Sequence, residues 1–164
     1  MITEVILSLL FSYVPWARIR KWIYSEKEFL DDIELDVRAS NPVSFSLSSQ
    51  IPTANIYLRI TNKSQYLEAI FDRAILSVWI NSDDGCQPIL HEAHIISKKG
   101  IKQKKSEDIH CQIDLNERQI SRLEKIKDSK RLQSTLHVEI HINSSVYHHL
   151  WKKFSLENRQ CKIE

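Results

Sequence analysis

The histidines near the C-terminal end of the chain have a spacing that could bind a metal ion. His137, Glu139 and His141 alternate with apolar residues, so on a β-strand their side chains would share one face. A two-residue turn at Ser144–Ser145 would place His148 opposite His141 on the following strand. Zinc accepts imidazole and carboxylate ligands. We expect this face to be polar and solvent-exposed, without a metal. The alternative is a metal-dependent enzyme, and its candidate ligands are His141, His148 and Glu139.

A run of lysines around one glycine, KKGIKQKK, offers a second kind of chemistry. The glycine and the flanking strand patterns predict a β-hairpin loop that carries five cations. Such a loop could contact anionic lipid or nucleic acid, whereas a solvated loop that discourages edge pairing is the plain alternative. The run contains no aromatic residue, so stacking on single-stranded bases is not supported. The candidate anion-binding residues are Lys98, Lys99, Lys102, Lys104 and Lys105.

An uncharged apolar run, VILSLLFSYVPW, occupies residues 5–16 and is followed by cations mixed with aromatic residues. Rings and cations at such a boundary favour the headgroup region of a membrane. A full span needs about 20 apolar residues, so an interfacial or half-inserted helix fits better. A helix packed on protein and a cleaved signal peptide are the alternatives. The residues expected to contact the membrane are Leu9, Leu10, Phe11, Trp16, Arg18, Arg20, Lys21 and Trp22.

Composition bears on compartment and on enzymatic activity. If the N-terminal segment spans a membrane, the cations that follow it place the rest of the chain in the cytoplasm. Three cysteines without a CxxC pair agree with a reducing compartment. Only 2 glycines are present, too few for a phosphate-cradling loop, and no catalytic constellation is recognisable. We therefore expect no enzyme, no cofactor and no small-molecule substrate.

The elements that must position these residues are mostly strands. Alternation of apolar and polar residues predicts half-buried strands, and two longer β-branched runs predict two more. The alternating runs cover residues 33–37, 43–47, 56–60, 109–115 and 136–142, and the longer runs cover 70–80 and 89–96. One helix is predicted over residues 117–127, because Asn116 and Gln119 have the spacing of a capping box. A final strand follows, with Trp151 expected on its core face.

Regular short strands with turn signals predict a mainly β fold, an immunoglobulin- or fibronectin-like antiparallel β-sandwich. We divide the chain into a membrane-contacting hydrophobic segment with an N-terminal helix at 1–24, a charged connector at 25–32, the sandwich at 33–156 and a tail at 157–164.

The stretch ANIYLRITNKSQYLEAIFDRAILSVWIN, residues 54–81, resembles the opening of the late-embryogenesis-abundant type 2 domain. That family has an alternating strand, an Asn in the turn and a second long strand, and a later strand–helix–hairpin order is also similar here. The family's usual Asn-Pro is Asn62-Lys63 in this chain. The resemblance implies a small β-sandwich, in several members behind a transmembrane helix, with stress-related or binding roles and no established catalytic site.

These observations together favour a non-catalytic, membrane-associated β-sandwich that serves as a binding or adaptor module. Its partners would be membrane lipid, a protein, or both, contacted through the N-terminal segment. The first alternative is nucleic-acid binding through residues 98–105, and the second is the metal-dependent enzyme described above.

Overall fold

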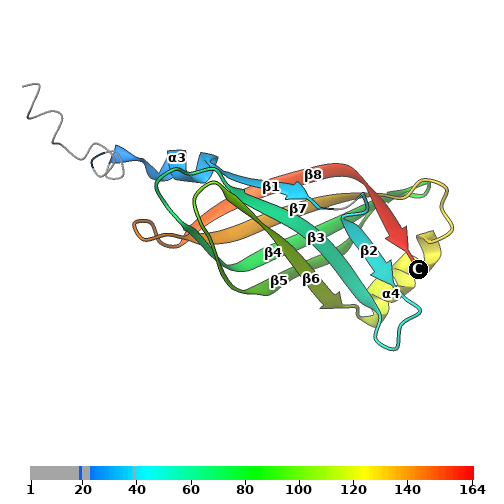
Figure 1. The fold of residues 1–164 in the computed structure, drawn as a ribbon. Coiled ribbons are helices and arrows are strands. Elements are labelled where there is room, and N and C mark those ends of the chain that lie inside the picture. The colour runs from blue at the N-terminus through cyan, green and yellow to red at the C-terminus, as the bar shows by residue number, and fades with distance from the viewer. Residues whose placement is uncertain (1–18, 20–22, 39) are drawn as a thin grey trace, which may run out of the picture.

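The computed structural model describes residues 19, 23–38 and 40–164, and the side chains of all of these except residues 93–98. This part of the chain is mainly β (Figure 1). In chain order its elements are α3 (Glu26–Asp31), β1 (Ile33–Val37), β2 (Val43–Ser46), β3 (Thr53–Asn62), β4 (Ala69–Ser82), β5 (Gly85–Ile101), β6 (Lys105–Asp114), α4 (Glu117–Ile126), β7 (Gln133–Asn143) and β8 (Leu150–Ile163). The predicted strands and the predicted helix after Asn116 are confirmed.

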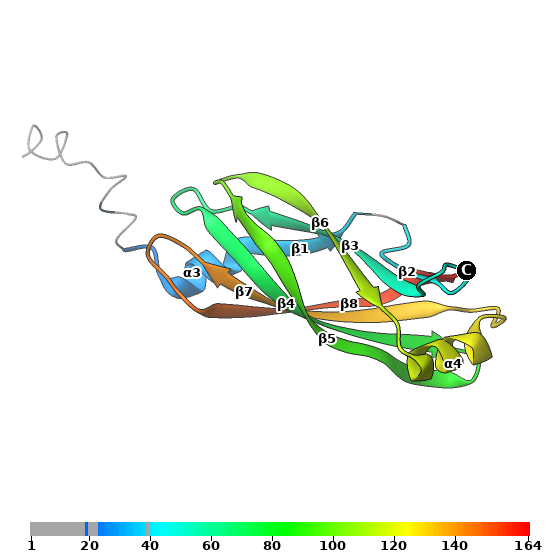
Figure 2. The same cartoon turned by 90° about the horizontal axis from the view of Figure 1, so that it is seen from below.

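The strands belong to one connected, mixed sheet made of two antiparallel groups. In the first group, β3 pairs with β6 along one edge. Its other edge pairs with β2 over residues 53–56 and with β1 over residues 58–62. In the second group the order is β5–β4–β7–β8. A short parallel pairing of β2 with β8, Val43 opposite Cys161, joins the two groups. Figure 2 shows β1, β3 and β6 lying to one side of β4, β5, β7 and β8.

Both groups contribute to a single hydrophobic core. Along β3, Ile56, Leu58 and Ile60 are buried, while Tyr57 and Arg59 between them face outward. The same alternation in β4 buries apolar side chains against them in one cluster. The structure therefore confirms a mainly β fold; an immunoglobulin-like sandwich stays a prediction.

Two segments for which no helix or strand was predicted contain ordered elements. The expected connector at 25–32 contains α3, because Ser25 and Glu28 make a capping box and Phe29 is fully buried. Residues 157–164, expected as a tail, continue β8, where Cys161 and Ile163 pack against the core. The predicted N-terminal hydrophobic helix lies outside the described residues.

The predicted two-residue turn between β7 and β8 is wrong. The connection runs over residues 144–149, with the Ser144 hydroxyl accepting from the Tyr147 backbone N–H at 2.9 Å and His149 at a φ of 58°. The longer turn changes the register, so Trp151 lies opposite His141 and Ser155 opposite His137. It also changes the phase of β8, and Trp151, expected in the core, is 40% exposed.

Candidate functional site

Three segments that are far apart in the sequence meet at one end of the domain, which we call the α3 end. They are residues 23–32, the β5–β6 turn at 102–104 and the β7–β8 turn at 144–149 (Figures 1 and 2). The Tyr147 hydroxyl donates to the Tyr24 carbonyl at 2.5 Å, and the Tyr24 and Tyr66 ring centroids are 5.2 Å apart. The Gln103 side chain donates to the Tyr66 carbonyl at 3.4 Å. These contacts link all three segments.

Aromatic rings hold the start of α3 on the sheet. The Phe29 ring lies edge-to-face with Tyr24, centroids 6.4 Å apart, and stacks on Tyr147 at 6.1 Å. The Tyr24 hydroxyl donates to the Asp32 carboxylate at the other end of the helix. Burial, and then this hydrogen bond, raise the pKa of Tyr24 well above its ordinary value. The helix is therefore fixed at both of its ends by Tyr24.

Lys152 on β8 fixes the C-terminal end of α3. Its Nζ donates to the main-chain carbonyls of Leu30 at 2.5 Å and Ile33 at 2.7 Å, and lies 5.1 Å from the centroid of the Phe154 ring. The last carbonyls of a helix lack partners within the helix, so a cation placed there satisfies them. Partial burial lowers the pKa of Lys152, although nearby carboxylates act in the opposite direction.

The surface of the α3 end combines exposed apolar groups with cations. Ile23 is 70% exposed and Val146, at the tip of the β7–β8 turn, is 44% exposed. The exposed lysines of this end are Lys27 on α3 and Lys102, Lys104 and Lys105 around the β5–β6 turn. Three carboxylates of α3, Glu26, Glu28 and Asp31, are also exposed here, so the excess of positive charge lies on the β5–β6 side of this surface.

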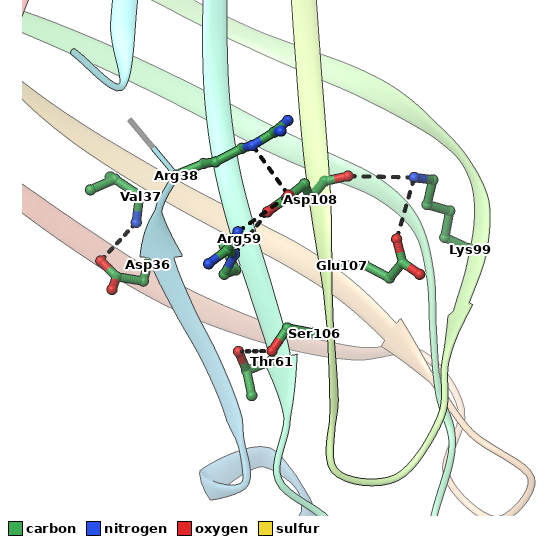
Figure 3. A network of polar contacts seen from close by, with 9 residues as sticks. All are labelled: Asp36, Val37, Arg38, Arg59, Thr61, Lys99, Ser106, Glu107 and Asp108. Carbon is green, nitrogen blue, oxygen red and sulfur yellow. Dashed lines mark hydrogen bonds and ion pairs between the residues drawn. The ribbon is translucent and has the colours of Figure 1, made fainter. Parts of the chain in front are cut away.

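The lysine run forms a hairpin, as predicted, but its members differ. β5 ends at Ile101 and β6 begins at Lys105, with Lys104 at a φ of 56° in the turn. Lys99 lies half-buried, with its Nζ 3.9 Å from Glu107 and 3.4 Å from the Asp108 carbonyl (Figure 3). The Lys98 side chain lies outside the described part. Lys102, Lys104 and Lys105 make no ion pair with any described residue, and so are available to an anion.

A carboxylate network covers the outer face of β1, β3 and β6 and was not predicted from the sequence. Asp108 accepts from Arg59 at 2.8 Å and lies 3.2 Å from the Nε atom of Arg38 (Figure 3). The hydrogen bond from Arg59 holds the pKa of Asp108 below its usual value. Arg59 and Asp108 are register partners across β3 and β6. The Arg59–Asp108 contact joins two strands on an exposed face. It could be predicted only from the register of β3 against β6, which the sequence pattern does not give.

The histidine face does not converge as a metal site. His141 is 2% exposed, and its Nδ1 lies 2.6 Å from the Asp72 carboxylate, beside an irregularity in β4 between Phe71 and Arg73. Burial acts to raise the pKa of Asp72, but the hydrogen bond and charge of His141, together with the neighbouring Arg73, outweigh it and lower the pKa.

The other two candidate ligands are engaged or displaced. Glu139 pairs with Lys153 at 2.9 Å, and His148 is exposed in the turn. No three metal-ligating side chains gather among the residues that the structure describes. His148 therefore lies within the six-residue turn and not opposite His141, whose register partner is Trp151.

The expected membrane-contacting residues lie outside the described part of the chain. They are Leu9, Leu10, Phe11, Trp16, Arg18, Arg20, Lys21 and Trp22. Within the described residues, no helix is long and apolar enough to cross a membrane.

Comparison with known proteins gives a fold likeness. No protein-family model matches the chain, and no curated protein matches it. A solved protein from Archaeoglobus fulgidus has a TM-score of 0.44 and 6% identity, over 78% of this chain and 96% of that one. A solution structure assigned provisionally to the late embryogenesis abundant (LEA) proteins has a TM-score of 0.51 and 11% identity, over 97% of this chain and 86% of that one. At this identity the likeness concerns the fold alone: this chain has a fold similar to that of the LEA protein.

Proposed function

We propose that this protein is a non-catalytic binding module that is held at a membrane by its N-terminal segment and carries a β-sandwich domain on the cytoplasmic side. The observation that carries the proposal is the convergence at the α3 end. The segments that carry the exposed Ile23, the exposed Val146 and the exposed lysines around the β5–β6 turn lie at the same end of the domain. Apolar groups beside cations suit the boundary between acyl chains and anionic headgroups.

The contacts around α3 give such a module a defined orientation. Tyr147 and Lys152 tie the start and the end of α3 to the β7–β8 hairpin. A flexible connector would leave the domain free to tumble about its anchor, whereas a helix tied to the sheet keeps the same end of the domain toward the membrane. The resemblance to the LEA type 2 family, in which several members follow a transmembrane helix, agrees with this arrangement.

Membrane partition tests the anchor. The full chain and a shortened chain that begins at Ile23, which keeps the buried Tyr24, would be expressed and their membranes washed with alkaline carbonate. We expect the full chain to stay with the washed membranes and the shortened chain to be released. If both are released, the apolar segment is covered by protein and the proposal of a membrane anchor is wrong.

Vesicle binding tests the lysines. The double variant Lys102→Gln/Lys105→Gln should bind phosphatidylserine-containing vesicles less tightly by about 2 kcal/mol, because each lysine near an anionic surface contributes about 1 kcal/mol. That change corresponds to roughly 30-fold in affinity. The matched control Lys130→Gln/Arg131→Gln removes two charges at the opposite end and should bind like the parent. Equal weakening of both would show that net charge alone is responsible.

A further inference from the structure

A basic cavity lies at the opposite end of the domain from α3. It has a volume of about 460 Å³ and lies between the start of β2, the connection from α4 to β7 and the end of β8. Figure 1 shows these segments near the C-terminus and α4, away from the α3 end. Volumes of about 300–1,000 Å³ are typical of small-molecule sites.

The charges that line this cavity have one sign. Lys130, Arg131 and Lys162 line it, and none of its lining residues is an Asp or Glu. Cys161 also lines it, and burial raises the pKa of that thiol to about 12, so the thiol is neutral at pH 7. Two carboxylates lie nearby: Glu164 pairs with Lys162, and Asp83 accepts from the Lys130 backbone N–H at 3.1 Å. The Lys130 and Arg131 side chains make no ion pair within the described chain.

A second observation points to a missing acceptor. Arg159 lies two residues before Cys161 on β8, and both side chains are half-buried, so they share one face of the strand. The Arg159 Nε atom is shielded from solvent and has no hydrogen-bond partner. Arg159 is not itself a lining residue, but it shares its strand face with Cys161, which lines the cavity. A buried donor of a charged group is costly when it has no acceptor, and an anion seated beside Cys161 would supply one.

We propose that this cavity binds a small phosphate-bearing anion. Lys130 and Arg131, which have no ion-pair partner within the described chain, supply the positive charge, and Arg159 donates from the buried side. Guanidinium groups match the geometry of phosphate oxygens and bind them through paired hydrogen bonds. The side chains of Asn41, Gln133 and Gln160 offer neutral donors and acceptors for the rest of the ligand. The inference does not depend on membrane attachment.

Two further cavities differ from the basic cavity in charge or in size. The cavity of about 350 Å³ beside α3 is lined by Glu28, Asp31 and Asp32, with Lys63 as its one lining cation. The cavity of about 270 Å³ between β5 and α4 is smaller, but it is lined by Arg118 and Arg122 and by no carboxylate; the Arg122 guanidinium already donates to the Pro88 carbonyl at 2.8 Å. A test of the proposal must therefore separate the basic cavity from these two arginines.

Calorimetric titration of the full chain in detergent with inorganic pyrophosphate, at about 0.15 M ionic strength where surface charges are well screened, tests the proposal. The variant Lys130→Gln/Arg131→Gln should weaken pyrophosphate binding by about tenfold or more, because charge-assisted hydrogen bonds are lost. The charge-matched control Arg118→Gln/Arg122→Gln, at the smaller cavity between β5 and α4, should change it by less than about twofold. Arg159→Met keeps the volume of the buried side chain and should also weaken binding by about tenfold.

The comparison of the parent protein with the two double variants decides whether pyrophosphate binds in the basic cavity. No heat of binding from the parent protein at millimolar pyrophosphate would overturn the proposal, as would equal weakening by both double variants. Unchanged binding of pyrophosphate by Arg159→Met would also overturn the proposal, because the Arg159 guanidinium is the buried donor that the anion is proposed to satisfy. A thermal melt of each variant separates loss of binding from loss of folding: a variant that melts like the parent and has lost pyrophosphate binding supports the site.

Discussion

Replacing Lys152 with Met should release the C-terminal end of α3 from the sheet. The Lys152 Nζ makes hydrogen bonds of 2.5 and 2.7 Å to the carbonyls of Leu30 and Ile33. A hydrogen bond to a charged group contributes about 1.5–3 kcal/mol. Half-burial of the ammonium, which lowers its pKa, offsets part of this contribution, and the methionine side chain keeps contact with the Phe154 ring. We expect Lys152→Met to lower the free energy of unfolding by about 1–3 kcal/mol.

The neighbouring lysine is a matched control for this change. Lys153 points to the opposite face of β8, with a side chain that is 77% exposed and paired with Glu139 at 2.9 Å. An exposed pair of this kind contributes about 0–1 kcal/mol. Lys153→Met should therefore lower the free energy of unfolding much less than Lys152→Met does, when both are measured by urea denaturation.

Hydrogen exchange locates the effect. The backbone N–H groups of Phe29 and Asp32 donate to Ser25 and Glu28 at 3.0 Å within α3, and their exchange should quicken by about 10–100-fold in Lys152→Met if the helix opens locally. Amides of β4 and β7 should exchange as in the parent. Unchanged exchange in α3, or equal destabilisation by the two variants, would refute the role of Lys152 in fixing the helix.

Three further predictions follow from side-chain burial and pairing. Cys86 is exposed, whereas burial raises the pKa of Cys111 to about 11 and of Cys161 to about 12, so a thiol reagent at pH 8 should modify one cysteine in the native protein and all three in urea. Asn62→Ala should lower the free energy of unfolding by about 2–4 kcal/mol, because this fully buried side chain makes hydrogen bonds of 2.8, 2.9 and 3.1 Å that nothing would replace; urea denaturation measures it. The histidine partner of Asp72 lowers the folded-state pKa of that carboxyl, so its contribution to stability is present above about pH 4 and is lost as the pH falls through the folded-state pKa; Asp72→Asn should flatten the acid limb of stability against pH, and an unchanged limb would contradict this.

The positions of most elements could be predicted because their signals are local. Alternation identified the strands from Ile33 onward, and the spacing of Asn116 and Gln119 identified the start of α4. No helix was predicted in the charged stretch at 25–32, although Ser25 and Glu28 have the same capping-box spacing. What the sequence could not show is that Phe29 would be buried against Tyr147 of the distant β7–β8 turn.

The sites were harder to predict than the strands because each depends on register. The length of the β7–β8 turn decided whether His141 met His148 or Trp151, and Ser144 determined that length through side-chain hydrogen bonds that no alternation pattern encodes. The lysine run was visible in the sequence. The ion pair of Lys99 with Glu107 and its hydrogen bond to the Asp108 carbonyl were not.

The sequence by itself determined where strands form, which of their faces is apolar, and that positive charge gathers around residue 100, since each of these is a property of neighbouring residues. Only the tertiary structure decided which residues meet. The α3 end joins segments near residues 24, 103 and 147, and the basic cavity joins residues near 41, 130 and 160. Contacts between residues so far apart in the sequence follow from strand pairing across the whole domain. The free energy that selects one pairing comes from burial of the apolar core, to which every strand contributes.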